Sequence, residues 1–275
     1  MPRDSVANTL KVAFLLCLAC SLLVSGTAVG LRSRQLDNKA DEMRKNVLKA
    51  AGLWHDGDDI SERFKSVDVR AIELATGEET DAVDPATYDP RAALNSPIDS
   101  AAIPAAEDIA EIKRLEKYEI VYLVKDADGA IDQIVLPIRG YGLWSTLWGF
   151  ISLDAAGLAD RPEVVKVRGI TFFEHKETPG LGGEVDNPTW KDRWSDPDQP
   201  KYVFDADWNV LIQVVKGSVL PDDPDAKHQV DGLAGATFTT AGVRNMLHFW
   251  LGESGFGPYL KHLHEDLAKE GASRD

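Results

Sequence analysis

The chain has 275 residues, enough for one or two domains, and its 45 acidic residues outnumber its 30 basic residues, for a formal net charge of −15. This balance argues against nucleic acid as a partner, because binding to a phosphate backbone requires a basic surface. It suits a well-solvated domain.

Residues 12–31 form an uncharged apolar run bounded by Lys11 and Arg32. At ~1.5 Å per residue, about 20 helical residues match the ~30 Å hydrocarbon core of a bilayer. A cleaved signal peptide is the alternative, but the run exceeds the ~7–15 residues of a usual signal core, which favours an uncleaved anchor in contact with lipid. Both cysteines, Cys17 and Cys20, lie in this run, so the residues after it contain no disulfide. We interpret the pair as two small apolar side chains rather than a redox or metal site.

Beyond the anchor we expect a stalk and linker over residues 32–60 and a folded domain over residues 61–275. Apolar and charged residues alternate at helical spacing from 36 to 53, which indicates a helix that continues the anchor. Residues 66–74 alternate apolar and polar side chains, the pattern of a half-buried strand. Residues 81–108, rich in Pro, Ala, Asp and Ser, indicate a long surface loop with short helical turns, either dispensable or facing a partner.

The clearest hairpin joins residues 118–124 to residues 131–138 through an Asp-Gly turn at 126–129. Five further elements follow, namely a strand over 164–173, a short helix over 184–194 interrupted by Pro188, a strand over 210–215, and helices over 239–251 and 259–268. This order favours an α+β fold with a mostly antiparallel sheet flanked by helices. No G-x-G-x-x-G follows a strand, so a dinucleotide-binding βαβ unit is not supported.

The stretch from residue 231 to residue 240 leads a Gly- and Ala-rich turn into the helix expected at 239–251. A helix N-terminus presents free N–H groups and the positive end of the helix dipole, which suits a phosphate. Small residues at Gly235 and Ala236 let a ligand approach the backbone, and Thr237 places a hydroxyl there. On local chemistry alone, an ordinary helix cap is the commoner explanation of such a turn.

Two other segments could line a ligand. Residues 140–145 (Gly-Tyr-Gly-Leu-Trp-Ser) follow the hairpin and would present aromatic rings to a flat ligand, unless they form a β-to-helix corner that packs a Trp in the core. The run 174–184 contains two pairs that impose tight turns, Pro-Gly at 179–180 and Gly-Gly at 182–183. His175 in this run lacks the convergent ligands that a metal site requires, so no metal is expected.

Several of these motifs resemble one known family. Asp-Gly-x-x-Gly-Ala-Thr at 231–237 resembles the flavinylation motif of the FMN-binding domain in the C subunit of Na+-translocating NADH:quinone reductases, and in the G subunit of the related electron-transport complex. Gly-x-Gly-Leu-Trp-Ser at 140–145, Thr-Pro-Gly-Leu-Gly at 178–182 and Ala-Val-Gly-Leu-Arg at 28–32 resemble stretches of the same family. The resemblance covers nearly the whole chain and is weakest over residues 81–108.

The resemblance implies that Thr237 carries FMN through a phosphoester bond, installed by a separate flavin transferase. One position departs from the family, because Ala234 stands where Ser or Thr is usual, which removes a possible phosphate contact but not the acceptor. The other implied cofactor-binding residues are Asp231, Gly235 and Ala236 around the attachment point, Leu143, Trp144 and Ser145 at one wall, and Glu177, Thr178, Gly180 and Leu181 in a loop beside the ring. Lys216 is either an exposed lysine at a strand end or a cation near the flavin that stabilises its reduced, anionic form.

On this resemblance we expect an electron-carrier subunit, not catalytic alone, that relays single electrons through FMN toward quinone in a multi-subunit, Na+-pumping NADH:quinone oxidoreductase. The resemblance places residues 1–11 in the cytoplasm, the anchor in a bacterial inner membrane and the soluble domain in the periplasm. The count of Lys and Arg residues on the two sides of the anchor favours the opposite orientation. This charge rule is weak for long domains, which can cross the membrane regardless of charge. Two alternatives stay open. One is the FMN-bearing G subunit of the ferredoxin-linked complex, which the long insert and the 177–183 stretch disfavour, and the other is a membrane-anchored binding or scaffold domain without flavin.

Overall fold

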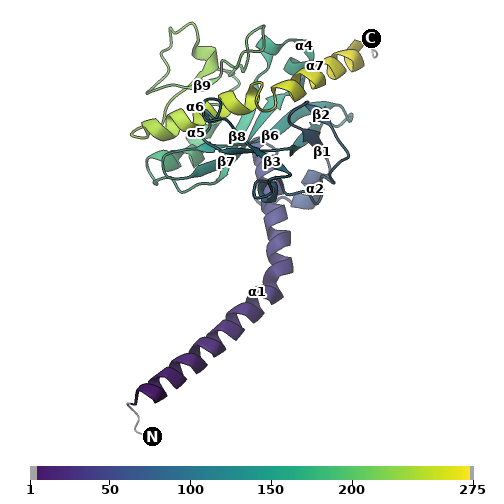
Figure 1. Ribbon diagram of the computed structural model, residues 1–275. Coiled ribbons are helices and arrows are strands. Elements are labelled where there is room, and N and C mark those ends of the chain that lie inside the picture. The colour runs from purple at the N-terminus through teal and green to yellow at the C-terminus, as the bar shows by residue number, and fades with distance from the viewer. Residues whose placement is uncertain (1–4, 273–275) are drawn as a thin grey trace. The chain divides into compact units, whose positions relative to one another are not determined.

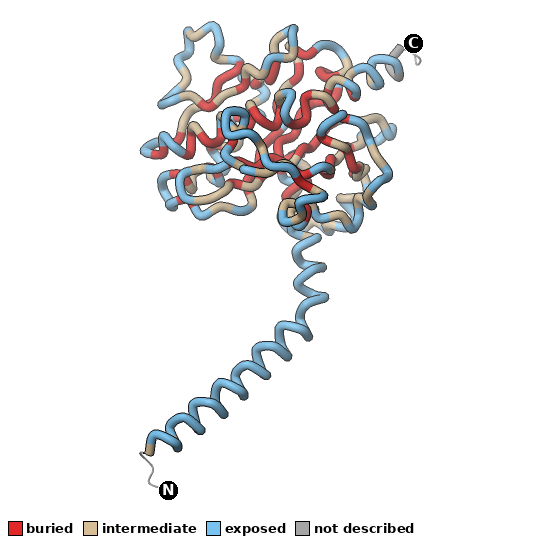
Figure 2. The backbone as a smooth tube through the Cα atoms, in the orientation of Figure 1, coloured by how far each residue is buried: buried red, intermediate tan, exposed pale blue. Residues whose placement is uncertain are grey.

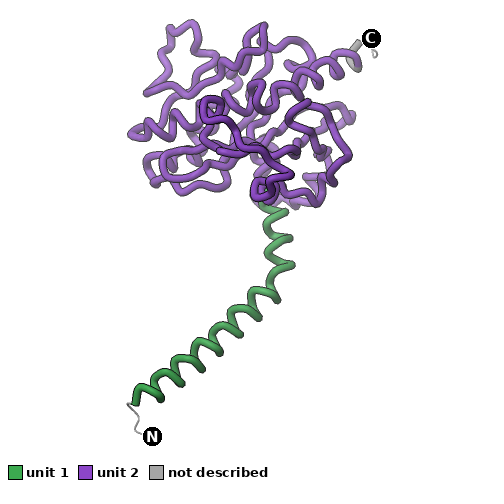
Figure 3. The backbone as a smooth tube through the Cα atoms, in the orientation of Figure 1, with its two compact units in different colours: residues 1–44 green, residues 45–275 purple. Residues whose placement is uncertain are grey.

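The computed structural model describes residues 5–272, with side chains described as far as residue 269. The chain divides into two units, residues 1–44 and residues 45–275 (Figure 3). Buried segments gather in the interior of the second unit, whereas the first unit is exposed along almost all of its described length (Figure 2).

A single helix, α1 (Val6–Ala50), contains both the expected anchor and the helix expected after it. It is the one helix among the described residues that is long and apolar enough to cross a membrane, a test of length and composition that a signal sequence would also pass. Its final turn belongs to the second unit, where Val47, Leu48 and Ala50 are buried.

The second unit is built on a six-stranded sheet in the order β2-β1-β5-β6-β7-β8, with every neighbouring pair antiparallel (Figure 1). This arrangement confirms the predicted α+β class and antiparallel sheet. The strands are β1 (Val67–Glu73), β2 (Glu78–Glu79), β5 (Tyr118–Lys125), β6 (Ile131–Tyr141), β7 (Thr146–Asp154) and β8 (Val167–Glu174). The predicted hairpin is confirmed as β5–β6, closed by the N–H of Asp126 on the carbonyl of Ala130 (2.9 Å) with Gly129 at φ +83°.

Helices α6 (Thr237–Leu251) and α7 (Gly257–Ala272) run along one side of this sheet (Figure 1). The apolar face of α6 buries Val243, Met246, Leu247 and Trp250 in one core with the β6 residues Ile134, Leu136 and Ile138. Each such side chain contributes about 1.5–3 kcal/mol on burial. The Trp250 indole N–H also donates to the carbonyl of Arg139 at the end of β6 (2.7 Å), so α6 is fixed in register against that strand.

The segment before β1 also contacts the sheet. Phe64 of α2 (Ile60–Phe64) meets the ring of Tyr122 edge-on at 6.3 Å, and Gln133 of β6 donates to the carbonyl of Ala51 (3.1 Å). The remaining elements are α3 (Pro90–Ala93), β3 (Ser100–Ala102), β4 (Arg114–Glu116), α4 (Ala155–Asp160), α5 (Pro188–Asp192), β9 (Gln213–Val214), β10 (Gln229–Val230) and the 3-10 turns η1 (Pro162–Val164), η2 (Gly182–Asp186) and η3 (Ala226–His228).

The structure differs from the predicted elements at several places. The helix expected over 184–194 is instead the 3-10 turn η2 followed by α5, which begins at Pro188. Strand β7 was not predicted, because its run Leu-Trp-Gly-Phe-Ile-Ser-Leu is apolar on both faces and lacks the alternation of a half-buried strand. The strand expected at 164–173 begins only at Val167, since Pro162 starts a 3-10 turn. Of the strand expected at 210–215, only β9 is regular, paired in parallel with β10. The surface loop expected at 81–108 contains α3, in line with the short helical turns predicted there, but it also contains the strand β3, which pairs with β4.

Candidate functional site

The hydroxyl of Thr237 lies at the first residue of α6 and is exposed. The preceding residue, Ala236, makes no side-chain capping bond, so the first N–H groups of the helix are not capped by a neighbour. Gly235 adopts φ +72°, a conformation that glycine tolerates, and a Cβ there would lie 2.8 Å from the Leu181 side chain. The turn therefore brings a hydroxyl, a helix N-terminus and a leucine side chain together.

The carboxylate of Asp231, at the start of the same turn, is engaged within the protein. It pairs with Arg193 and accepts the N–H of Val219 (2.7 Å), while its carbonyl accepts the indole N–H of Trp190 (2.8 Å). Further along, the N–H of Leu233 donates to the hydroxyl of Thr240 (3.1 Å). In this structure Asp231 therefore fastens the turn to Trp190 of α5, to Arg193 directly after that helix, and to Val219 in the segment that precedes the turn.

Residues 142–145 form the tight turn between β6 and β7, closed by the N–H of Gly142 on the carbonyl of Ser145 (2.9 Å). The alternative of a β-to-helix corner with a buried Trp is wrong, because a strand follows and Trp144 is 65% exposed. Leu143 is 41% exposed. Two adjacent large apolar side chains therefore stand exposed at this turn, which makes them candidates for covering a ligand.

The loop after β8 makes a second tight turn beside the first. The carbonyl of Thr178 accepts the N–H groups of Leu181 (3.1 Å) and Gly183 (2.9 Å), and Gly180 adopts φ +76°. Thr178 is exposed and Leu181 is 42% exposed. The hydroxyl of Ser145 accepts the N–H of Lys176 (2.7 Å), which joins this loop to the β6–β7 turn.

Glu177 holds these segments together. Its side chain is 5% exposed, and its carboxylate accepts the backbone N–H groups of Trp144 (2.9 Å), Leu143 (3.1 Å) and Ser145 (3.3 Å). The hydroxyl of Thr239, in the first turn of α6, donates to the same carboxylate (2.7 Å). One buried carboxylate thus joins the β6–β7 turn, the loop after β8 and the helix that begins at Thr237.

Two glycines leave room for this carboxylate. A Cβ on Gly142 would lie 2.7 Å from Glu177 Oε1, and a Cβ on Gly182 would lie 2.6 Å from Glu177 Oε2. The predicted Gly-x-Gly and Leu-Gly-Gly patterns therefore have a packing reason in addition to their turns.

Sequence reasoning missed two residues of this site. Phe238 is 69% exposed directly after Thr237, and Thr239 is buried against Glu177. The signal for Thr239 was present, because three threonines among the first four residues of a helix are poor helix formers and imply side-chain hydrogen bonding. An exposed Phe has no such signature in the sequence.

Lys216 is exposed on a turn that contacts the start of the motif. The carbonyl of the next residue, Gly217, accepts the N–H of Gly232 (2.7 Å), and a Cβ on Gly232 would lie 2.2 Å from the carbonyl of Val215. The structure thus brings the backbone beside Lys216 to the 231–237 turn and leaves its ammonium in solvent.

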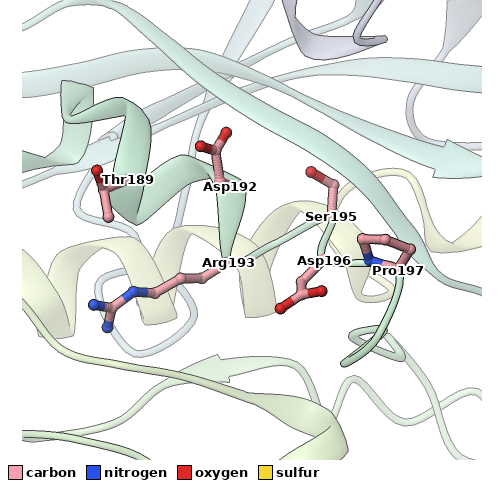
Figure 4. A pocket seen from close by; sticks show the side chains of 6 residues that line it. All are labelled: Thr189, Asp192, Arg193, Ser195, Asp196 and Pro197. Atoms are coloured by element: carbon pink, nitrogen blue, oxygen red, sulfur yellow. The ribbon is translucent and has the colours of Figure 1, made fainter.

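A separate hollow of about 500 Å³ lies at the end of α5. It is lined by Thr189, Asp192, Arg193, Ser195, Asp196 and Pro197, and in Figure 4 the side chains of Arg193 and Asp196 point to one side and that of Asp192 to the other. None of the predicted cofactor residues lines it. Among the described residues, no group of three or more His, Cys, Asp or Glu side chains is placed to hold a metal ion.

The chain is similar to known flavin-binding proteins over the residues that form this site. A family described as FMN-binding domain matches residues 142–252, a range that holds the β6–β7 turn, the loop after β8 and the start of α6. The C subunit of the Na(+)-translocating NADH-quinone reductase of Pseudomonas aeruginosa is 45% identical over 270 residues, which cover 97% of this chain and 99% of the relative. The C subunit of the same enzyme from Yersinia pestis is 41% identical over 273 residues, which cover 98% of this chain and 97% of the relative.

Solved structures agree with these relatives. NqrC of Shewanella oneidensis matches with a TM-score of 0.72 and 32% identity, covering 83% of this chain and 99% of that chain. The C subunit of the Na(+)-translocating NADH-quinone reductase of Parabacteroides distasonis matches with a TM-score of 0.59 over 85% of this chain and 96% of that chain, and at 22% identity it supports the fold alone. With full-length relatives at this identity, the chain belongs to the family of the C subunits of Na(+)-translocating NADH-quinone reductases.

Proposed function

We propose that this chain is the FMN-carrying subunit of a Na+-translocating NADH-quinone reductase and that the flavin is attached through its phosphate to Thr237. The observation that carries the proposal is the exposed Thr237 hydroxyl at an uncapped helix N-terminus, inside the range that matches the FMN-binding domain. The relatives described above are all named as C subunits of the sodium-translocating enzyme, which favours the sodium-pumping complex over the ferredoxin-linked one.

The residues present fit FMN at both of its ends. A phosphate on Thr237 would meet the first N–H groups and the positive dipole end of a 15-residue helix. The apolar side chains exposed around the turns would cover a flat ring, and they are Leu143, Trp144, Leu181 and Phe238. Gly235 allows the chain to pass close to the ligand, and Lys216 is free to approach its negative charge. Asp231, Ser145, Glu177, Thr178 and Gly180 act by shaping the backbone on which these groups stand.

When bound, FMN supplies one-electron redox chemistry that the side chains of this domain lack. The chain itself holds the ring between two turns, excludes water with apolar side chains and keeps the cofactor from dissociating. A covalent tether also holds the ring at high effective concentration near the electron donor and acceptor. Those donors and acceptors belong to the other subunits of the complex, and quinone is the final acceptor.

The apolar part of α1 anchors the chain in lipid, and we place the second unit in the periplasm, where a dissociated flavin would be lost. A flavin transferase would attach the cofactor there. Ala234 is exposed beside Gly235 and offers no hydroxyl to the phosphate, so attachment depends on Thr237 and the backbone alone.

The test is to express the full chain with a flavin transferase, denature the purified protein and measure flavin fluorescence that stays with the polypeptide. We expect stable fluorescence in the wild type and in Thr237→Ser, and none in Thr237→Ala. Thr189→Ala is the matched control, since Thr189 is another exposed threonine in the first turn of a helix. Flavin that washes away from the wild type, or fluorescence kept by Thr237→Ala, contradicts the proposal and favours a scaffold domain without flavin.

A further inference from the structure

Arg91 comes from the 81–108 segment, which the sequence indicated to be dispensable or partner-facing. It lies in the short helix α3, where Asp89 caps the helix by accepting the N–H groups of Arg91 (3.0 Å) and Ala92 (3.3 Å). Its side chain reaches across 83 residues of sequence to Glu174, the last residue of β8. The 81–108 segment, which contains none of the motifs that resemble the known family, therefore makes a specific contact at the edge of the cofactor site.

The guanidinium of Arg91 is held on two sides. Its central carbon lies 3.7 Å from the centre of the Trp148 ring, and its Nη1 donates to Glu174 Oε2 (2.8 Å). Its Nε and Nη2 atoms are buried without a hydrogen-bond partner. Buried N–H groups beside an indole face are the mark of a cation–π contact, in which the ring takes the place of a hydrogen-bond acceptor.

Trp148 and Glu174 are themselves neighbours across the β7–β8 ladder, and theirs is the terminal pair of that ladder, near the start of β7 and at the end of β8. The β6–β7 turn, residues 142–145, lies just before β7, and the loop from residue 175 leaves from Glu174. The ladder is also irregular here, with a register shift between Trp148 and Gly149. A bulge weakens the pairing locally, so this end of the ladder depends on side chains to hold it closed.

We propose that Arg91 is a positioning residue of the cofactor site, which clamps the ends of β7 and β8 together and thereby sets the spacing of the two turns that face the flavin. Glu177 ties the two turns at their tips, and Arg91 ties the strands that carry them. The role in flavin binding rests on the proposed function, but the clamp itself is a property of the polypeptide and can be measured without flavin.

The first measurement is amide hydrogen exchange of the full chain purified without a flavin transferase. In Arg91→Ala we expect exchange to rise about tenfold at residues 142–148 and 173–181, from loss of a partly desolvated cation–π contact and an ion pair. Arg91→Lys, which keeps the charge but not the planar stack, should lie between this variant and the wild type. Arg168→Ala is the control, because Arg168 is an exposed residue of β8 that pairs with Asp132 across 3.6 Å and contacts neither turn.

The second measurement uses protein made with the transferase. Arg91→Ala should keep its covalent flavin content, while iodide quenches its flavin fluorescence more strongly and the flavin midpoint potential shifts. Exchange in Arg91→Ala could rise throughout the domain because the variant is destabilised as a whole. In that case the milder variants Glu174→Gln and Arg91→Lys are used instead, and a rise in their exchange that is confined to the two turns supports the clamp. The clamp proposal is overturned if, in every variant, amide exchange at both turns equals that of the Arg168→Ala control. Failure of the proposed function would instead appear as an unmodified Thr237, with the flavin-free exchange data unaffected.

Discussion

Replacing Glu177 by glutamine is expected to loosen the attachment of the β6–β7 turn to the loop after β8 without unfolding the domain. Glutamine is nearly isosteric, so its carbonyl can still accept the N–H groups of Leu143, Trp144 and Ser145, which the carboxylate now accepts at 2.9–3.3 Å. The hydroxyl of Thr239 can reverse and accept from the new amide. What is lost is the charge. A hydrogen bond to a charged acceptor is worth about 1.5–3 kcal/mol net and one to a neutral acceptor about 0.5–1.5 kcal/mol, so weakening the three retained bonds by roughly 0.5–1 kcal/mol each costs about 1.5–3 kcal/mol.

A loss of this size has a definite consequence for the turn. Each ~1.4 kcal/mol is tenfold in an equilibrium, so local opening of residues 143–145 should become roughly 10- to 150-fold more frequent. Glu177→Ala should cost more, about 3–5 kcal/mol, because it leaves several N–H groups without an acceptor and opens a cavity.

Amide hydrogen exchange resolved at residues 143–145 measures this directly, with urea unfolding as the check that the fold persists. Glu184→Gln is the matched control, since Glu184 lies in the same loop and its carboxylate accepts the side-chain amide of Asn187 (2.6 Å), with no backbone N–H donor to that carboxylate among the described residues. Exchange at residues 143–145 that stays at the wild-type rate in Glu177→Gln would refute the view that this carboxylate organises the site.

Two further predictions concern stability. Burial and the neighbouring Glu116 carboxylate raise the pKa of Glu119 well above its ordinary value of 4.5. The folded chain therefore retains a proton that the unfolded chain releases above that value, and the free energy of unfolding should fall as pH rises, by up to about 1.4 kcal/mol per pH unit until Glu119 ionises. Urea unfolding measured between about pH 5 and about pH 8 should show this slope in the wild type and a smaller slope in Glu119→Gln, and equal slopes would contradict the raised pKa of Glu119. Gly242→Ala should destabilise the domain by about 1–3 kcal/mol, because its Cβ would lie 2.3 Å from the carbonyl of Tyr141. A urea midpoint unchanged from the wild type would show that α6 can move away from β6 at little cost.

The fold was predictable where side-chain periodicity reports burial on one face. The β5–β6 hairpin and α6 follow from alternation, a turn signal and helical spacing, and the structure contains both. Strand β7 was not predictable in this way, because it lies between β6 and β8 and is buried on both faces along most of its length. An apolar run of that length has no period from which to distinguish a strand from a buried helix.

The site was predictable as motifs but not as an assembly. Gly235, Thr237 and the Pro-Gly turn at 179–180 carry local signals, whereas the contact of Glu177 with Thr239 joins residues 62 positions apart. Arg91 is the extreme case, since nothing in the composition of residues 81–108 indicates that one arginine crosses to Trp148. Long-range side-chain pairs depend on the tertiary fold, and a single sequence does not encode them as a pattern.

The attachment of FMN to one threonine at the start of α6 is tested most directly by mass spectrometry. The sample is the proteolytic peptide that contains Thr237, from membranes in which an active flavin transferase is present. We expect this peptide to gain the mass of FMN less one water, with fragmentation that locates the addition on Thr237. An unmodified peptide from the same membranes, or an addition located on another residue, would contradict it.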